Sequence, residues 1–122
     1  MKTTDILNQS HPEIKIRANW CSSFGSKLKG LMFVQSLPDY SGIILVENSE
    51  SRINTAIHML FMNFDITAVW INAAHQVVDV CLAKKWHLYY SSRTEAQYVL
   101  ETSTRHLHDF SIGDQLTFSN EK

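Results

Sequence analysis

Residues 54–72, NTAIHMLFMNFDITAVWIN, form the most apolar stretch of the chain and limit the folds open to it. Its apolar runs are interrupted well before the length of about 20 residues that a membrane-spanning helix needs. In an extended chain alternate residues point to opposite faces, and over 56–62 both faces are apolar. We therefore expect a strand buried on both sides, a bend at 63–65, and a second strand over 66–72.

Other segments also have the period and composition of strands. Residues 14–21, IKIRANWC, alternate between apolar and polar side chains, which predicts a half-buried strand. Apolar or β-branched runs predict further strands at 43–47, 77–82, 97–102 and 115–118, with 77–82 as the hairpin partner of 66–72. Two short helices are expected, one capped by Ser26 and interrupted by Gly30, the other capped by Ser103 or Thr104 and running to 110.

About seven short strands without full-length crossover helices predict a mainly β fold, an antiparallel barrel or sandwich with two short helices. A chain of 122 residues fits one domain. Residues 1–13 are polar and end in Ser10-His11-Pro12, so we expect a loose N-terminal lead-in. Residues 14–119 are then expected to form the single β domain.

The charge balance argues against a nucleic-acid partner, because 11 Lys and Arg face 12 Asp and Glu and the formal net charge is −1. One cluster, KKWHLYY at 84–90, interleaves cations with aromatic rings, as single-strand binding surfaces do. It is short and isolated. We expect Trp86 to close one end of the core, with Lys84 and Lys85 in solvent.

The N-terminus has no apolar segment of signal-peptide length, so we expect a cytoplasmic protein without a membrane partner. Cys21 and Cys81 stand far apart in the sequence and form no C-x-x-C pair. Two free, buried thiols fit a reducing compartment better than a disulfide framework does.

Several kinds of catalytic site are excluded or disfavoured by the sequence. Four glycines cannot build a phosphate-binding loop, and we expect no cofactor. His106 and His108, with Asp109 beside them, could share a face on a strand and bind zinc. On the expected short helix they point apart, so we expect surface histidines and no metal. No pattern supplies an activated nucleophile, and no catalytic residue is assigned.

His58 is the most informative single residue, because its neighbours in the sequence are apolar. A histidine in such a place is usually neutral and hydrogen-bonded. The alternative is an acid–base role in which Asp65 or Glu101 orients the ring.

The segments KGLMF, GIILVE, IHMLFMNFDITAVWIN, VVDV, KKW, VLE and IGDQLTF occur in this order over about residues 27–118. In order and spacing they resemble the domain of unknown function 192 family of small bacterial and archaeal proteins. The resemblance implies a mostly β domain with short helices and no settled biochemical activity.

This chain departs from the family pattern in several places. Where members usually have a proline and, two residues on, an acid, it has Asp65 and Thr67. Where many members have an arginine after GLMF, it has Val34. The polar family positions that remain are Lys29, His58, Glu101 and Asp114.

The sequence thus favours a small binding module with an aromatic-lined apolar pocket near Trp86, His58 and Glu101. The expected binding residues are His58, Trp86, Glu101, Lys29 and Asp114. An enzyme that uses His58 with Glu101 or Asp65, and an accessory domain that docks a partner through exposed aromatic side chains, are the alternatives. The partner is expected to be a small molecule or a protein, and the protein itself a monomer or weak homodimer.

Overall fold

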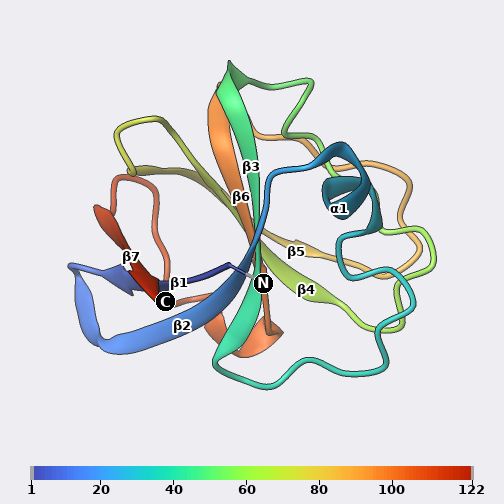
Figure 1. Cartoon of the computed structure of the whole chain (residues 1–122), viewed down its shortest axis with the longest axis horizontal. Coiled ribbons are helices and arrows are strands. Elements are labelled where there is room, and N and C mark those ends of the chain that lie inside the picture. Colours follow the sequence, from blue (N-terminus) through green and yellow to red (C-terminus); the bar gives the residue numbers. More distant parts are fainter. Residues whose placement is uncertain (1, 122) are drawn as a thin grey trace.

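The structure, a computed structural model, describes the backbone of residues 2–121 and the side chains of residues 2–119. Seven strands and two short helical segments follow one another along the chain (Figure 1). They are β1 (Thr3–Asn8), β2 (His11–Cys21), α1 (Phe24–Lys29), β3 (Ser41–Ser51), β4 (Ile66–Ile71), β5 (Val77–Ala83), β6 (Ala96–Thr102), the 3-10 turn η1 (Thr104–His106) and β7 (Leu116–Glu121).

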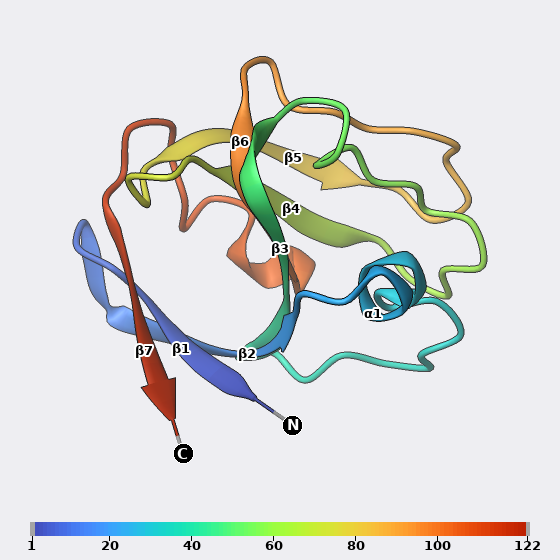
Figure 2. The same ribbon diagram turned by 45° about the horizontal axis from the view of Figure 1, so that its top comes forward.

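The described strands form one curled sheet in the order β5-β4-β6-β3-β2-β1-β7 (Figure 2). The mainly β class predicted from the sequence is confirmed. Neighbouring strands are antiparallel except for β2 and β3, which run parallel. The expected antiparallel arrangement does not extend to this pair, because α1 and the segment after it carry the chain across so that β3 runs in the same direction as β2.

The N-terminal segment is part of the sheet. β1 pairs with β2 on one side and β7 on the other, so the prediction of a loose lead-in is wrong for Thr3–Asn8. The sequence did not predict this strand because several of its residues are polar. Thr4, Asp5 and Asn8 are nevertheless buried and hydrogen-bonded. Thr4 donates to the backbone of Ser119 (2.8 Å), for example.

The predicted strand over 56–62 is absent from the structure. Residues 52–65, the covering loop, lie over one face of the sheet, and only Ile57 forms a β-bridge, with Tyr90. The Trp70 indole donates to the carbonyl of Thr55 (2.8 Å) and fixes the loop to β4. The stretch is apolar because its buried side chains pack down onto the sheet, not because it runs through the sheet.

The core has two parts, one on each side of the sheet. All six residues of β4 are buried, as expected for a strand covered on both faces. Along β6 the side chains alternate, so that Val99 packs into the part under the covering loop and Leu100 into the other. Glu101 therefore shares its face with Val99, towards α1 and the covering loop.

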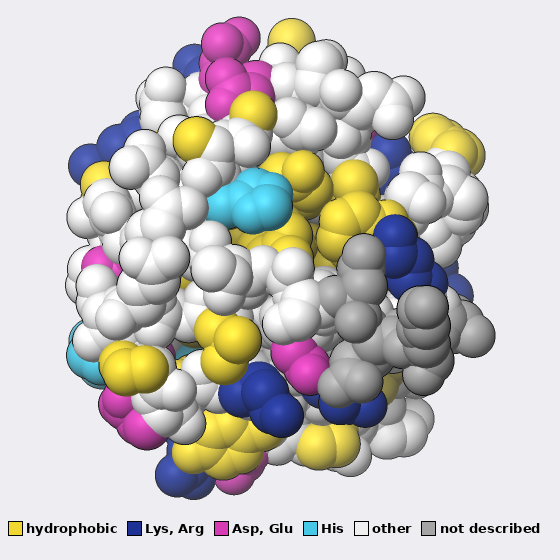
Figure 3. Space-filling view, turned by 60° about the vertical axis from the view of Figure 1, so that its left-hand side comes forward, with side chains coloured by type: hydrophobic (Ala, Val, Ile, Leu, Met, Phe, Trp, Pro, Cys, Tyr) yellow, Lys and Arg dark blue, Asp and Glu magenta, His cyan; other side chains and the backbone are white. Residues whose placement is uncertain are grey.

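The second part of the core is closed by aromatic side chains. Trp20, Tyr98 and Phe118 pack against it, and the His75 ring stacks on Phe118 with centroids 4.1 Å apart. Figure 3 shows hydrophobic side chains gathered beside a histidine on this side of the molecule. The sequence predicted this closing role for Trp86 instead, and that prediction is wrong because the Trp86 side chain is 58% exposed.

Gly42 allows β3 to pass close to β6 beside Glu101. A Cβ at this position would lie 2.4 Å from the carbonyl oxygen of Glu101, nearer than any real contact allows. The backbone of the site therefore depends on a residue without a side chain.

Candidate functional site

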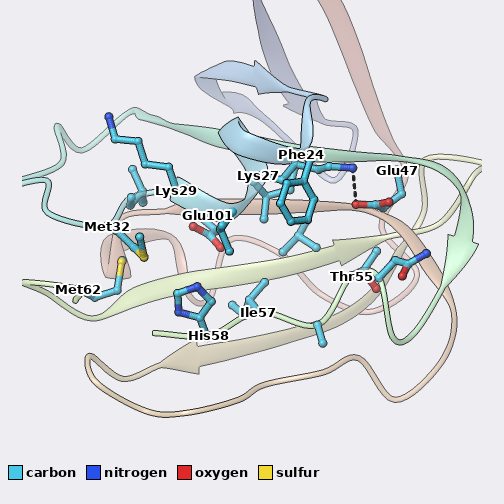
Figure 4. A pocket seen from close by; sticks show the side chains of 17 residues that line it. Phe24, Lys27, Lys29, Met32, Glu47, Thr55, Ile57, His58, Met62 and Glu101 are labelled. Carbon is cyan, nitrogen blue, oxygen red and sulfur yellow. Dashed lines mark hydrogen bonds and ion pairs between the residues drawn. The ribbon is translucent and has the colours of Figure 1, made fainter. Parts of the chain in front are cut away.

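The structure has a cleft of about 390 Å³ between α1 and the covering loop (Figure 4). Its floor comes from β3 and β6, which contribute Leu45 and Val99. Its walls are mostly apolar, as in most small-molecule sites. The apolar side chains that line it are Phe24, Leu28, Leu31, Met32, Leu45, Ala56, Ile57, Met62 and Val99.

Helix α1 is held over the cleft by its two ends. The Ser23 side chain accepts from the backbone amide of Ser26 (3.1 Å) and caps the first turn, so the cap is Ser23 and not the predicted Ser26. At the other end Gly30 has φ +48°, which favours glycine, and turns the chain towards Leu31 and Met32.

Glu101 projects into the middle of the cleft, with Met32 and Met62 on one side and Phe24 on the other (Figure 4). The residue is only 5% exposed. No hydrogen bond or ion pair joins its carboxyl group to another described residue. Its oxygen atoms keep contact with the open cleft, because no fully buried side-chain oxygen or nitrogen of the described residues lacks a hydrogen-bond partner. A buried carboxyl group without a partner is rare in folded proteins, because it is expensive to remove from water.

Burial raises the pKa of Glu101 to about 7. The cause is the loss of water around the ionised form, since no neighbouring charge compensates it. Near neutral pH the group is therefore divided between carboxylic acid and carboxylate. Shifts of this size at a buried carboxyl group inside a cleft are typical of functional sites.

Other polar groups of the cleft have partners or point away from Glu101. Lys27 forms an ion pair with Glu47 at 2.7 Å. Lys29 lies on the rim with its ammonium group directed outwards (Figure 4). Burial and the nearby Glu101 carboxylate both raise the pKa of the Cys21 thiol, which keeps it protonated.

His58 also lines the cleft, but it does not pair with an acid. Its Nδ1 accepts from the backbone amide of Leu60 (3.2 Å), and Nε2 has no hydrogen bond to any described residue. Asp65, one of the two expected partners, accepts instead from the backbone amide of Lys85 (2.9 Å). The structure brings His58, Glu101 and Lys29 to one cleft without a direct bond between them.

Trp86 is not among the residues that line the cleft. It contacts Phe61, which contacts Phe33, with both pairs of ring centroids 5.2 Å apart. All three side chains are exposed, and all three residues have φ between 63° and 67°. We call Phe33, Phe61 and Trp86 the aromatic patch. Among the described residues that line the cleft, Phe24 and His58 alone carry rings, so its walls are mainly aliphatic rather than aromatic.

Asp114 lies elsewhere, in the turn before β7. It accepts from the side chain of Asn8 (2.9 Å) and from the backbone amide of Ser111 (2.9 Å). Burial raises its pKa, but these hydrogen bonds outweigh burial and leave the pKa below its ordinary value. The geometry gives Asp114 a structural place at the end of β1 and none in the cleft.

His106 is fully buried in η1, contrary to the expectation of a surface histidine, whereas His108 is exposed as predicted. The ring of His106 is hydrogen-bonded to Asp109 (2.8 Å) and to the carbonyl of Asp39. Within the described residues no group of histidine, cysteine and acidic side chains has the arrangement of a metal site.

Several cleft residues were not predicted from the sequence. Met32 and Met62 come from separate loops, and Glu47 comes from β3, so no spacing along the chain links them to Glu101. Period two along β6 could have shown that Glu101 shares a face with Val99. No pattern in the sequence shows that Glu101 lacks a hydrogen-bond partner among the described residues.

Comparison with known proteins agrees with the fold and with the segments quoted above. The model of DUF192, described as Uncharacterized ACR, matches residues 6–118. The chain belongs to the DUF192 family. A UPF0127 protein of Pyrococcus furiosus is 33% identical over 109 residues, which cover 88% of this chain and 90% of the relative.

A UPF0127 protein of Thermococcus kodakarensis is 35% identical over 101 residues, 79% of this chain and 60% of the relative. A UPF0127 protein of Thermococcus gammatolerans is 35% identical over 79 residues, which is 65% of this chain and 50% of the relative. The chain thus matches only half to three-fifths of the length of these two DUF192-family relatives.

Two solved structures share the fold. A Novosphingobium aromaticivorans protein of unknown function has a TM-score of 0.80, with 94% of this chain and 83% of that chain covered. A Sinorhizobium meliloti protein, whose suggested role is transcription regulation, has a TM-score of 0.81, with 96% and 92% covered. Both are 16% identical to this chain, so the likeness concerns the fold alone.

In the described part of this DUF192 protein no helix is both long and apolar enough to cross a membrane.

Proposed function

We propose that this DUF192 protein binds a small, mainly apolar molecule in the cleft beneath α1. The observation that carries the proposal is Glu101, a buried carboxyl group that faces an open cleft and lacks a partner among the described residues. A ligand with a hydrogen-bond donor would supply that partner.

The energetics of Glu101 support binding over a purely structural role. Leaving a carboxylate buried and unpaired costs several kcal/mol in real proteins, even after local relaxation. Such a cost lowers the stability of the free protein, and an apolar residue at the same place would avoid it. Protonation avoids this cost, and above the raised pKa a donor that approaches the carboxylate recovers it.

The walls of the cleft support the same function. Aliphatic and methionine side chains offer apolar area without a fixed pattern of hydrogen bonds, and methionine adapts to ligands of different shape. A volume of about 390 Å³ lies in the range of small-molecule sites. The affinity would come from apolar burial and the orientation from Glu101.

The methionines provide the test. Met32 and Met62 line the cleft, whereas Met59 is fully buried and is not part of the lining. In protein labelled with 13C at the methionine methyl groups, hexan-1-ol should shift the Met32 and Met62 signals in a saturable way and leave Met59 nearly unchanged. Ala56→Phe, which fills the cleft from the covering loop, should abolish the shifts.

Absence of saturable shifts at Met32 and Met62 in the wild-type protein would contradict the proposal. So would equal shifts at Met59, because they would indicate general partition into the core rather than occupation of the cleft.

A second candidate is an enzyme in which Glu101 acts as a general acid or base. The observation in its favour is the pKa of about 7, which suits proton transfer at neutral pH. His58 could assist through Nε2, since Nδ1 is occupied by the Leu60 amide. Hydrolysis of p-nitrophenyl acetate should then fall in both Glu101→Gln and His58→Gln. Equal rates in wild type and both variants would count against this role.

A third candidate is self-association or partner docking through the aromatic patch. The three exposed, mutually contacting rings favour it. Sedimentation velocity over a range of protein concentrations tests the weak homodimer directly. Any dimer that forms through this patch should disappear in Trp86→Ala, and a dimer that persists unchanged would exclude the patch.

We also propose a cytoplasmic location. The free thiols of Cys21 and Cys81 support it, and burial raises the pKa of Cys81 to about 11, which makes that thiol unreactive. Fractionation of cells that produce the full-length protein would test the location.

A further inference from the structure

We propose that the ligand of the cleft is an alkylammonium group, a primary amine at the end of an aliphatic chain, with its ammonium beside Glu101. The inference rests on the proposed binding function and names the chemical class of the ligand.

The first argument is the arrangement of oxygen atoms around Gly30. The position that a Cβ of Gly30 would occupy lies 3.6 Å from Glu101 Oε1 and 3.7 Å from the carbonyl oxygen of Lys27. The same position lies 3.6 Å from the Ile43 Cδ1 methyl group. Because residue 30 is glycine, no side chain stands between Glu101 Oε1, the Lys27 carbonyl oxygen and the Ile43 methyl group, and both oxygen atoms border the place that a side chain would fill.

The Lys27 carbonyl belongs to the last turn of α1, where carbonyl groups have no partner within the helix. Unpaired carbonyl oxygens at the C-terminal end of a helix carry partial negative charge and favour a cation. The Glu101 carboxylate and the Lys27 carbonyl therefore select for the same kind of ligand group. Both are acceptors, and both favour a positively charged donor over a neutral or negative one.

The number of donors distinguishes an ammonium from a guanidinium. A guanidinium group presents five N–H donors in a plane, whereas an ammonium presents three in a compact arrangement. Glu47, the other carboxylate of the lining, is already paired with Lys27, which leaves Glu101 and the Lys27 carbonyl as the acceptors beside Gly30. The open corner therefore fits the smaller donor set better.

The apolar walls of the cleft match the aliphatic stem of the proposed ligand. Met32 and Met62 stand beside Glu101 on the side that Figure 4 shows, and Val99 precedes it on the same face of β6. An aliphatic stem packed against these side chains keeps its apolar surface out of water while its end group reaches the carboxylate.

The charged and titratable groups around Glu101 come from four elements. α1 contributes Lys27 and Lys29, β3 contributes Glu47, β2 contributes Cys21 and the covering loop contributes His58. Lys27 is neutralised by Glu47, and the Lys29 ammonium points out of the cleft. In the described part of the cleft, Glu101 is the negative charge that an incoming cation meets.

The experiment compares hexan-1-amine with hexan-1-ol, which have the same stem and differ in charge. With the 13C-methionine signals at pH 8, the amine should bind at least about tenfold more tightly than the alcohol, because charge-assisted hydrogen bonds are the stronger ones. In Glu101→Gln the two affinities should become equal, while alcohol binding persists and shows that the cleft is folded.

The pH supplies an independent measurement. Because the pKa of Glu101 is raised to about 7, a proton competes with the amine below that value. Amine affinity should fall from pH 8 to pH 5.5 towards the affinity of the alcohol, by tenfold or more and at most about thirtyfold, while alcohol affinity stays constant. His58→Gln should keep this pH dependence, and Glu101→Gln should lose it.

Equal binding of amine and alcohol to the wild-type protein would overturn the proposal and leave the binding function intact. A charge preference that survives in Glu101→Gln would overturn it as well. If neither compound binds, the proposed function fails with it. Nα-acetyl-lysine methylamide as a third probe separates the sources, since tighter binding than hexan-1-amine indicates a lysine side chain and weaker binding a free amine.

Discussion

Glu101 and His106 lie in consecutive elements, β6 and η1, and both are buried, but they differ in their hydrogen-bond partners. His106 lies in η1 with both ring nitrogens hydrogen-bonded, to Asp109 and to the Asp39 carbonyl. Glu101 lies near the end of β6, faces the cleft and has no such partner among the described residues.

The bonds of His106 join two segments of the chain. A carbonyl oxygen only accepts, so Nε2 must donate to Asp39. Nδ1 shares a hydrogen bond with the Asp109 carboxyl group across 2.8 Å. His106 thereby ties the turn before β3 to the segment after β6, which is a structural role.

The difference teaches how to distinguish a structural polar group from a functional one in this fold. Burial alone marks both residues. A complete set of partners indicates structure, and an incomplete set beside an open cleft indicates a place kept for a ligand. The following predictions test this contrast.

The largest effect is expected at His106. His106→Ala removes two hydrogen bonds from a fully buried site and leaves a cavity, so it should lower the free energy of unfolding by about 4 kcal/mol. The matched control is His108→Ala, at an exposed position in the same segment, which should change it by less than about 0.5 kcal/mol. Urea denaturation at pH 7 measures both. Equal effects would contradict the structural role.

Glu101→Gln should raise the free energy of unfolding at neutral and higher pH, whereas His106→Ala lowers it. The pKa of Glu101 is raised in the folded protein from 4.5 to about 7, so the folded state favours the protonated form. The wild-type protein therefore loses stability as pH rises from 4.5 to 7, by a total of about 3 kcal/mol. Gln cannot ionise and should remove this loss.

Urea denaturation at several pH values tests the Glu101 prediction. The variant should match the wild-type protein near pH 4 and exceed its stability at pH 8. Glu95→Gln, at an exposed position just before β6, is the control and should show no such trend. A Glu101→Gln protein that is less stable than the wild type at pH 8 would mean that the carboxylate has a stabilising partner.

Asp114 extends the contrast to a second carboxyl group. Hydrogen bonds from Asn8 and Ser111 outweigh burial and lower its pKa, so its contribution is present above pH 3.8 and is lost as pH falls through the lowered pKa. Asp114→Ala should cost about 1–2 kcal/mol at pH 7 and progressively less in acid. A stabilising effect at pH 7 would contradict the assignment of Asp114 to the structural class.

The smallest effect is expected at Trp86, which is exposed and outside the cleft. Trp86→Ala should change stability by less than about 0.5 kcal/mol and leave hexan-1-amine affinity unchanged. Calorimetry and the methionine titration measure the two quantities. A marked loss of amine binding would extend the site to the aromatic patch.

The sequence predicted the regular strands well, because alternation and β-branched residues are local signals. β2, β4, β5 and β6 lie within two or three residues of their expected bounds. It did not predict β1, because the buried residues of that strand include polar types that are common in loops. It predicted a strand in the covering loop, because the apolar side chains of that loop pack onto the sheet. Apolar composition indicates burial but not the partner of the backbone hydrogen bonds.

The site was only partly predictable for the same reason. Family resemblance pointed to His58, Glu101 and Lys29, and the structure places all three at the cleft. It also pointed to Asp114, and aromatic composition pointed to Trp86, which lie elsewhere. Whether a buried side chain has a partner depends on loops and strands distant in sequence, and no local pattern records that.

The most direct test of the account is the titration of Glu101 itself. In protein labelled with 13C at glutamate side-chain carboxyl groups, the signal that disappears in Glu101→Gln is followed with pH. The account predicts a pKa of about 7 in the free protein, and a lower value in the presence of hexan-1-amine. An ordinary pKa near 4.5 that the amine leaves unchanged would contradict it.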